Sequence, residues 1–210
     1  MSLLQLWLSP WFDLWGAPVT RLEVLAVVLS LGMVILNLRV NPWAWPLAMA
    51  ASLLYGVLFH HYGLYGEAAL QAVFVLVSFW GWWQWLWGRD EHQQALAVRP
   101  LPRRRWWQGL MFWAVAWVLI GGFMDHYTDS TVPYWDALPT AGSLLGQWWL
   151  ARKWIDNWPV WLMVNVVSVA LFAYKLMWLT AVLYAVFAVL SLAGWQAWRR
   201  LHQQLVAEAV

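Results

Sequence analysis

The chain has no cysteine and little charge, and both absences limit what it can be. Without cysteine there are no disulfides, thiolate metal ligands or cysteine nucleophiles. Charged residues make up 10% of the sequence, against roughly 25% in soluble domains, whereas hydrophobic residues make up 63%. The composition therefore predicts an integral membrane protein, and it argues against nucleic acid as a partner.

What the chain has instead is a series of long hydrophobic segments. A helix needs about 20 apolar residues to cross the hydrocarbon, and several segments come close to that length. Turn signals separate them, among them Asn41-Pro42 and Asp156-Asn157. We predict an all-α integral membrane fold with seven transmembrane helices near residues 21–38, 44–61, 64–87, 106–124, 133–151, 158–175 and 178–198.

Basic residues fall mostly on one side of these seven spans. Cytoplasmic loops carry an excess of Lys and Arg, so the C-terminus is predicted to be cytoplasmic and the N-terminus to lie outside. Only Arg21 and Lys175 are assigned to the outer side. The basic residues assigned to the cytoplasmic side are Arg39, Arg89, Arg99, Arg103, Arg104, Arg105, Arg152, Lys153, Arg199 and Arg200.

An internal repeat appears when the sequence is compared with itself at an offset of 113 residues. Of the 41 positions from 45 to 85, 13 are identical to their counterparts from 158 to 198. Apolar composition alone does not explain the paired Trp-Pro and Ser-x-x-Gly-Trp-x-x-Trp motifs. These motifs place Trp45-Pro46 on Trp158-Pro159, and Ser78, Gly81, Trp82 and Trp85 on Ser191, Gly194, Trp195 and Trp198.

The repeat indicates two three-helix blocks joined by a connector. Because three is an odd number, one extra helix between the copies makes them parallel, related by an axis along the membrane normal. We predict a single transmembrane transporter domain over residues 1–210, with repeat one at about 21–88, a connector helix at about 106–124 and repeat two at about 133–200. Such duplications place a substrate path between the halves, which favours transport over enzymology.

Polar and aromatic residues share faces of the predicted helices, as judged from helical spacing. Polar groups that face lipid are costly, so these faces are expected to point inward. The residues are Gln71, Trp82 and Trp85 in the third span, Trp161, Asn165 and Lys175 in the sixth, and Tyr184 and Trp195 in the seventh.

Each of these residues also has a structural interpretation. Asn165 and Gln71 could bond either a ligand or another helix, and Lys175 could extend to the membrane surface. The indoles could anchor helices at the interface or stack on a flat or cationic ligand. Serines such as Ser78 and Ser191 are better explained by close helix packing. No arrangement of His and carboxylates resembles a metal site, and no cofactor is expected.

Several stretches resemble the PnuC family of bacterial vitamin transporters, whose best-known members carry nicotinamide riboside. The resemblance covers about residues 21 to 200 and is most specific in the last three predicted spans. The stretches are LYGEAALQ (64–71), FWGWWQW (79–85), YWDALP (134–139), RKWIDNWPVWLMVNVVSV (152–169), AYKLMWLTAVLY (173–184) and GWQAW (194–198).

The resemblance implies facilitated diffusion of a nucleoside-like vitamin across the bacterial inner membrane, with phosphorylation inside the cell trapping the substrate. It also implies a homotrimer and a 3+1+3 helix arrangement similar to the SWEET sugar transporters. Matching positions give Gln71, Trp82, Trp85, Asn165, Lys175 and Tyr184 as substrate-binding residues, with Trp161 and Trp195 as weaker additions. Ser52 stands where the second copy has Asn165, and this reduced polarity leaves thiamine, riboflavin or another flat vitamin as alternative substrates.

Two other classes of function are weighed against transport. A membrane-embedded enzyme would need clustered carboxylates or a nucleophile with a base, and Glu23, Glu67 and Asp136 do not have such spacing. A non-transporting scaffold would need only anchoring tryptophans and packing serines. Loss of ligand binding in a folded Asn165 or Trp82 variant would separate a transporter from a scaffold.

Overall fold

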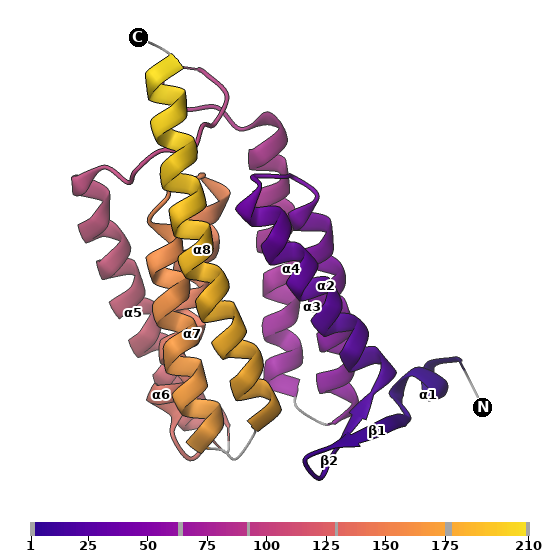
Figure 1. Cartoon of the computed structure of the whole chain (residues 1–210). Helices are drawn as coiled ribbons and strands as arrows, with labels where there is room; N and C mark the ends of the chain where they lie inside the picture. Colours follow the sequence, from indigo (N-terminus) through magenta and orange to yellow (C-terminus); the bar gives the residue numbers. More distant parts are fainter. Residues whose placement is uncertain (1–2, 63–64, 92, 129, 175–177, 209–210) are drawn as a thin grey trace. The chain divides into compact units, whose positions relative to one another are not determined.

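The computed structural model describes residues 3–62, 65–91, 93–128, 130–174 and 178–208. In this part of the chain there are eight helices and one two-stranded hairpin (Figure 1). The chain divides into a first unit, Met1–Trp83, and a second unit, Gln84–Val210. The predicted helical fold class is confirmed, with a short hairpin in addition.

The first unit opens with elements that the sequence analysis did not predict. A short helix α1 (Leu3–Leu8) is followed by strands β1 (Pro10–Leu14) and β2 (Ala17–Thr20). The strands pair antiparallel around Trp15 and Gly16, which have φ of 51° and 83°. Two successive positive φ values are typical of the tight turns that close hairpins, and Gly16 adopts one without steric cost.

Three longer helices follow, and α4 runs across the division between the units. They are α2 (Arg21–Leu38), α3 (Ala44–His61) and α4 (Tyr65–Trp87). Thr20 ends the hairpin and begins α2, because its buried hydroxyl accepts a hydrogen bond from the backbone N–H of Glu23 at 3.1 Å. Helices α2 and α3 pack against each other.

The second unit contains four long helices. They are α5 (Arg103–Tyr127), α6 (Pro133–Ala151), α7 (Asn157–Tyr174) and α8 (Trp178–Glu208). Helix α6 packs against both α5 and α7, and α7 packs against α8 (Figure 1). The buried core lies around α6 and α7 and contains Leu101, Leu145, Trp149, Trp154, Val160 and Val164.

The offset of 113 residues found in the sequence also relates the local structures. Adding it to the bounds of α3 gives those of α7, and adding it to the last residue of α2 gives that of α6. The turns that follow α2 and α6 contain residues at the same offset with nearly equal backbone angles, Val40 at φ 54° and Lys153 at φ 55°. The sequence repeat is therefore a repeat of local structure.

The predicted spans agree with the helices in position and differ in length at two places. Helix α5 begins three residues earlier and ends three residues later than the predicted span 106–124. Helix α8 continues to Glu208, beyond the predicted end at 198, and its added turns are held by a 3.1 Å contact between Nδ1 of His202 and the carbonyl oxygen of Val98. The hydropathy pattern stops at the charges Arg199 and Arg200, whereas the helix does not.

Four helices of the described part are long and apolar enough to cross a membrane. They are Arg21–Leu38, Arg103–Tyr127, Asn157–Tyr174 and the Thr180–Glu208 part of α8. Several spans are thus supported by length and composition, while the count of seven stays a prediction.

Candidate substrate-binding site

The repeated Trp-Pro and Gly-Trp motifs form one packing contact in each unit. A Cβ atom on Gly81 would lie 2.3 Å from the ring of Trp45, and one on Gly194 would lie 2.5 Å from the ring of Trp158. Both distances are far below ordinary van der Waals contact, so an indole of the middle helix fills space that only glycine leaves open. The motifs recur because they hold neighbouring helices together.

The predicted polar face of the second unit contains a buried hydrogen bond between α7 and α8. Asn165 is 5% exposed, and its amide nitrogen donates to the hydroxyl of Ser191 at 3.1 Å. That hydroxyl donates in turn to the carbonyl oxygen of Phe187 at 2.8 Å. Apolar surroundings make an unpaired amide costly, so this bond fixes the relative position of the two helices.

An aromatic stack lies on the same two helices. The ring of Tyr184 on α8 stacks on Phe172 of α7 with a centroid distance of 5.1 Å and an interplanar angle of 27°. Phe187 meets Tyr184 edge-on at 6.0 Å. The structure therefore places Asn165 and Tyr184 on one packed helix pair.

Two predicted indoles of the second unit have different surroundings. Trp161 is half-buried and packs across the missing side chain of Gly146 on α6, where a Cβ would lie 2.9 Å from the indole. Trp195 is also half-buried, and the guanidinium carbon of Arg199 lies 5.6 Å from its ring centroid. The Trp195 ring therefore makes a cation–π contact with Arg199. A cationic ligand would use the same kind of contact.

In the first unit, Gln71 lies on a groove between α3 and α4. The groove has a volume of about 400 Å³, and the short helix α1 contributes Leu4 and Leu8 to it. Most of the lining is apolar, and its polar side chains are Ser52, His60, His61 and Gln71. Trp82, which lies further along α4, is half-buried.

Trp85 has a clear structural contact. It is 6% exposed, its indole N–H donates to the carbonyl oxygen of Leu150 at 3.0 Å, and Nζ of Lys153 lies 5.3 Å from its ring centroid. These contacts attach the end of α4 to the end of α6. Lys175, the remaining predicted residue, lies outside the described residues. The part that the eight residues play in binding stays a prediction.

Sequence reasoning missed a folded loop, called here the 88–102 loop, whose described residues are 88–91 and 93–102. It runs beside the turn between α6 and α7, where Arg99 N–H donates to the carbonyl oxygen of Lys153 at 3.2 Å and Ile155 N–H donates to that of Arg99 at 3.0 Å. Asp156 accepts from the backbone N–H of Leu101 at 2.6 Å. Leu96, Val98 and Leu101 of the loop are buried, but this hydrophobic stretch is too short to predict a helix, and the charges of the loop were assigned only to membrane orientation.

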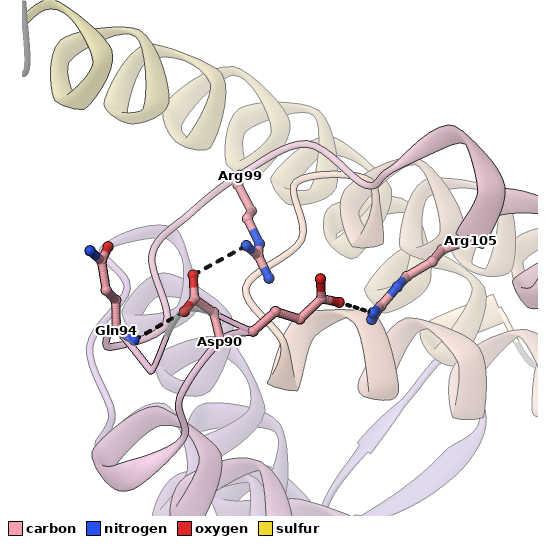
Figure 2. A network of polar contacts seen from close by, with 5 residues as sticks. Asp90, Gln94, Arg99 and Arg105 are labelled. Carbon is pink, nitrogen blue, oxygen red and sulfur yellow. Dashed lines mark hydrogen bonds and ion pairs between the residues drawn. The ribbon is translucent and has the colours of Figure 1, made fainter.

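Ion pairs hold the loop together. Oδ1 of Asp90 accepts from the backbone N–H of Gln94 at 3.0 Å, and its Oδ2 pairs with Nη1 of Arg99 at 3.4 Å (Figure 2). A second ion pair joins Arg105, at the start of α5, to Glu91. Burial, followed by the charges of Arg105 and Arg99, lowers the pKa of the Arg152 guanidinium, and burial lowers the pKa of the Lys153 ammonium group. The loop therefore brings both cations and the carboxylates Asp90 and Glu91 close to the Arg152 guanidinium.

Comparison with known proteins gives a consistent assignment. Residues 20–200 match the family described as nicotinamide mononucleotide transporter. The chain is 25% identical over 169 residues to the nicotinamide riboside transporter PnuC of Escherichia coli (strain K12), covering 69% of this chain and 71% of that protein. It is 28% identical over 196 residues to the riboflavin/roseoflavin transporter RibM of Streptomyces davaonensis, covering 91% of each.

The fold also matches a solved structure. The crystal structure of the vitamin B3 transporter PnuC has a TM-score of 0.69 and 21% identity to this chain, covering 87% of this chain and 82% of that one. Helices apolar enough to span a bilayer and these relatives define a multi-pass inner-membrane transporter, not an enzyme. The chain belongs to the nicotinamide mononucleotide transporter family. The predicted resemblance is confirmed.

Proposed function

We propose that this protein imports a flat vitamin across the inner membrane by facilitated diffusion, with nicotinamide riboside as the first candidate. The observation that carries the proposal is the family match over residues 20–200 together with a relative named as a nicotinamide riboside transporter. Such a carrier needs a site that binds a small polar and aromatic molecule, and the buried amide of Asn165 with the Phe172–Tyr184 stack supplies suitable groups.

Riboflavin is the second candidate substrate. The relative named as a riboflavin/roseoflavin transporter covers more of the chain than the Escherichia coli PnuC, 91% against 69%, with identities of 28% and 25%. Thiamine remains a third flat vitamin to test. All three present an aromatic ring system on which indole and phenol rings can stack.

Net uptake would come from phosphorylation of the vitamin inside the cell. A phosphate ester carries negative charge at neutral pH, and moving that charge through an apolar path is costly. The modified vitamin would therefore stay inside, and a carrier that only equilibrates its substrate would support accumulation.

The substrate-binding residues of this proposal are the eight from the sequence. The amides suit a carboxamide or ribose hydroxyls, and the indoles suit a pyridinium ring. They are Gln71, Trp82, Trp85, Trp161, Asn165, Lys175, Tyr184 and Trp195. Among them Asn165 and Tyr184 have the strongest support, because both lie on the packed α7–α8 pair.

The proposed architecture is a single domain of two parallel three-helix blocks with α5 as connector, assembled as a homotrimer. Support for the blocks comes from the helix bounds and turn angles that recur at the 113-residue offset. We also propose a periplasmic N-terminus and a cytoplasmic C-terminus. In the second unit the backbones of Arg99 and Lys153 are hydrogen-bonded, and His202 near the end of α8 contacts the same loop. The end of α8 therefore lies beside these basic residues, which supports placing it on the cytoplasmic side.

The test is transport by the purified chain in liposomes. Labelled nicotinamide riboside, riboflavin and thiamine are added separately, without ATP or an ion gradient. We expect one of them to equilibrate across the bilayer at a rate well above that of empty liposomes, and unlabelled substrate to compete. If none of the three enters faster than in liposomes carrying an unrelated membrane protein, the proposed function is wrong.

A further inference from the structure

The hairpin that precedes α2 exposes aromatic side chains and carries little charge. The first four residues of β1 are exposed, and they include Trp11 at 56% and Phe12 at 42%. Trp15, in the turn of the hairpin, is 69% exposed. Asp13 is the one charged residue among the first 20 of the sequence. Neighbouring aromatic residues exposed in this way mark a surface that is covered by a medium or partner less polar than water.

Backbone chemistry limits how deep in a membrane the hairpin can lie. Within the described part of the chain, β1 and β2 pair with each other and with no further strand, so the outer edge of each strand presents backbone N–H and C=O groups. Hydrocarbon offers such groups no hydrogen bonds, and the carboxylate of Asp13 is costly there as well. Water, in contrast, leaves the aromatic rings exposed. The layer between headgroups and acyl chains suits both, and tryptophan is enriched in that layer.

The hairpin also lies at the height of the headgroups, because it leads directly into a helix that can span the bilayer (Figure 1). Helix α2 has 18 residues and is therefore about 27 Å long, close to the roughly 30 Å thickness of the hydrocarbon. Its first residue, Arg21, then lies at the boundary of the hydrocarbon. The hairpin ends at Thr20, one residue before this boundary.

The side chain of Arg21 fixes the elements before α2 to the start of that helix. Its Nη1 donates to the carbonyl oxygen of Leu6 in α1 at 3.1 Å and to the hydroxyl of Ser9 at 3.2 Å. Its guanidinium carbon lies 6.0 Å from the ring centroid of Trp11 in β1. One side chain therefore links α1, β1 and α2, and the hairpin is held beside the point where α2 enters the membrane.

We propose that the hairpin of residues 10–20 is a membrane anchor, which inserts Trp11, Phe12 and Trp15 into the headgroup layer of the leaflet in which α2 begins. Its partner is the lipid surface. Burial of the aromatic rings supplies the affinity, while Asp13 and the strand edges stay hydrated. The anchor fixes the height of the first turn of α2 relative to the bilayer. It depends neither on the vitamin that is carried nor on which side of the membrane the hairpin lies.

The experiment measures the depth of the hairpin in the full-length chain, reconstituted in vesicles of phosphatidylcholine and phosphatidylglycerol. Because the sequence has no cysteine, Pro18→Cys can be labelled alone with an environment-sensitive nitrobenzoxadiazole fluorophore. Pro18 is exposed and pairs with Asp13, so the label lies on the hairpin and the three aromatic residues stay in place.

Two sets of vesicles locate the label. One contains lipid with a nitroxide at the headgroup, and the other contains lipid with a nitroxide at the end of an acyl chain. We expect the headgroup nitroxide to quench the label about twofold more strongly than the deep nitroxide, as for a segment lying in the interface. Ala97→Cys, labelled in the same way, is the reference, because Ala97 is exposed in the charged 88–102 loop. Its label should be quenched less by the headgroup nitroxide than the label on the hairpin.

Variants assign the quenching to the aromatic side chains. Phe12→Ser combined with Trp15→Ser, in the Pro18→Cys chain, removes two exposed rings and keeps Trp11 in contact with Arg21. Quenching by the headgroup nitroxide should fall to the level of the Ala97→Cys reference. Trp107→Ser is the matched control, since Trp107 is 73% exposed but lies on α5 in the second unit. It should leave the quenching unchanged.

Four results would overturn the proposal. Two concern the Pro18→Cys label alone: quenching by the headgroup nitroxide no stronger than that of the Ala97→Cys reference, or stronger quenching by the deep nitroxide. The other two are full quenching in the double serine variant, and an equal loss of quenching in Trp107→Ser. The first two need no change of an aromatic residue, so they decide the question even where the double serine variant does not fold.

Discussion

The indoles of Trp45 and Trp158 have a role that neither membrane anchoring nor ligand binding describes. Each is almost fully buried and lies where a glycine of the next helix has no side chain. Burying an indole removes a large apolar surface from contact with water or lipid. Because the ring is closely packed, a larger side chain at the facing glycine cannot be accommodated without a shift of the ring. The residues that are identical at the 113-residue offset therefore include packing contacts, and their identity is not by itself evidence of a binding site.

Replacing the glycine tests this packing. Gly194→Ala should lower the unfolding free energy by about 1–3 kcal/mol, because the new methyl group must displace the ring of Trp158. Gly81→Ala should behave in the same way against Trp45. Gly122→Ala is the control, since its Cβ would meet only the hydroxyl of Tyr134 at 4.0 Å, and alanine favours a helix.

These stabilities are measured by thermal unfolding in detergent. A Gly194→Ala protein as stable as the Gly122→Ala control would mean that the Trp158 ring moves aside freely.

The pair Asn165 and Ser191 separates helix packing from ligand binding. Ser191→Ala removes the acceptor of the Asn165 amide and should cost about 1 kcal/mol of stability, while the affinity for the vitamin changes little. Asn165→Ala should cost a similar stability and weaken binding about tenfold or more if its amide contacts the ligand. Titration calorimetry with nicotinamide riboside and riboflavin measures the difference. Equal losses of affinity in both variants would make Asn165 a packing residue only.

At the scale of elements, helix positions could be predicted and turn geometry could not. Hydrophobic length and the Asn41-Pro42 and Asp156-Asn157 signals located α3 and α7 to within one residue. No local preference indicates that Val40 has φ 54°, because a β-branched residue disfavours that region. The turn is set by the bonds that enclose it, such as Asn41 N–H to the carbonyl oxygen of Leu36 at 3.0 Å.

The candidate site shows the same limit. Helical spacing identified Asn165 and Tyr184 as members of polar faces, and the structure places both on the packed α7–α8 pair. Spacing does not say what a face packs against, so the hydrogen bond from Trp85 to Leu150 could not be predicted. The 88–102 loop also escaped prediction, because its structure depends on tertiary contacts: Leu96, Val98 and Leu101 are buried, and Asp156 accepts from the backbone N–H of Leu101.

The turn after α2 can be stabilised by one substitution. Val40→Gly should raise the unfolding free energy by about 0.5–1 kcal/mol, because relief of backbone strain exceeds the added entropy of glycine in the unfolded chain. Lys153→Gly has the same backbone angle but loses the bond from Nζ to Leu96, so it should destabilise. Thermal unfolding of both variants separates the effect of backbone strain from that of the lost hydrogen bond. A destabilised Val40→Gly protein would show that the Val40 side chain matters more than its φ.

At the scale of the whole molecule, the absence of cysteine becomes an experimental advantage. Single cysteines can be introduced without background labelling, and a membrane-impermeant maleimide then reports the side of the membrane on which each lies. Three exposed positions decide the topology: Arg39 after α2, Ala97 in the loop bonded to the α6–α7 turn, and Thr131 between α5 and α6.

Parallel repeats predict one pattern of labelling in intact bacteria. Thr131→Cys should react at once, whereas Arg39→Cys and Ala97→Cys should react only after the inner membrane is permeabilised, because the excess of basic residues retains those loops in the cytoplasm. Arg39→Cys and Ala97→Cys on opposite sides would mean that the two blocks are inverted rather than parallel. Thr131→Cys on the same side as Ala97→Cys would mean that α5 does not cross the membrane, and the connector that makes the two copies parallel would be lost.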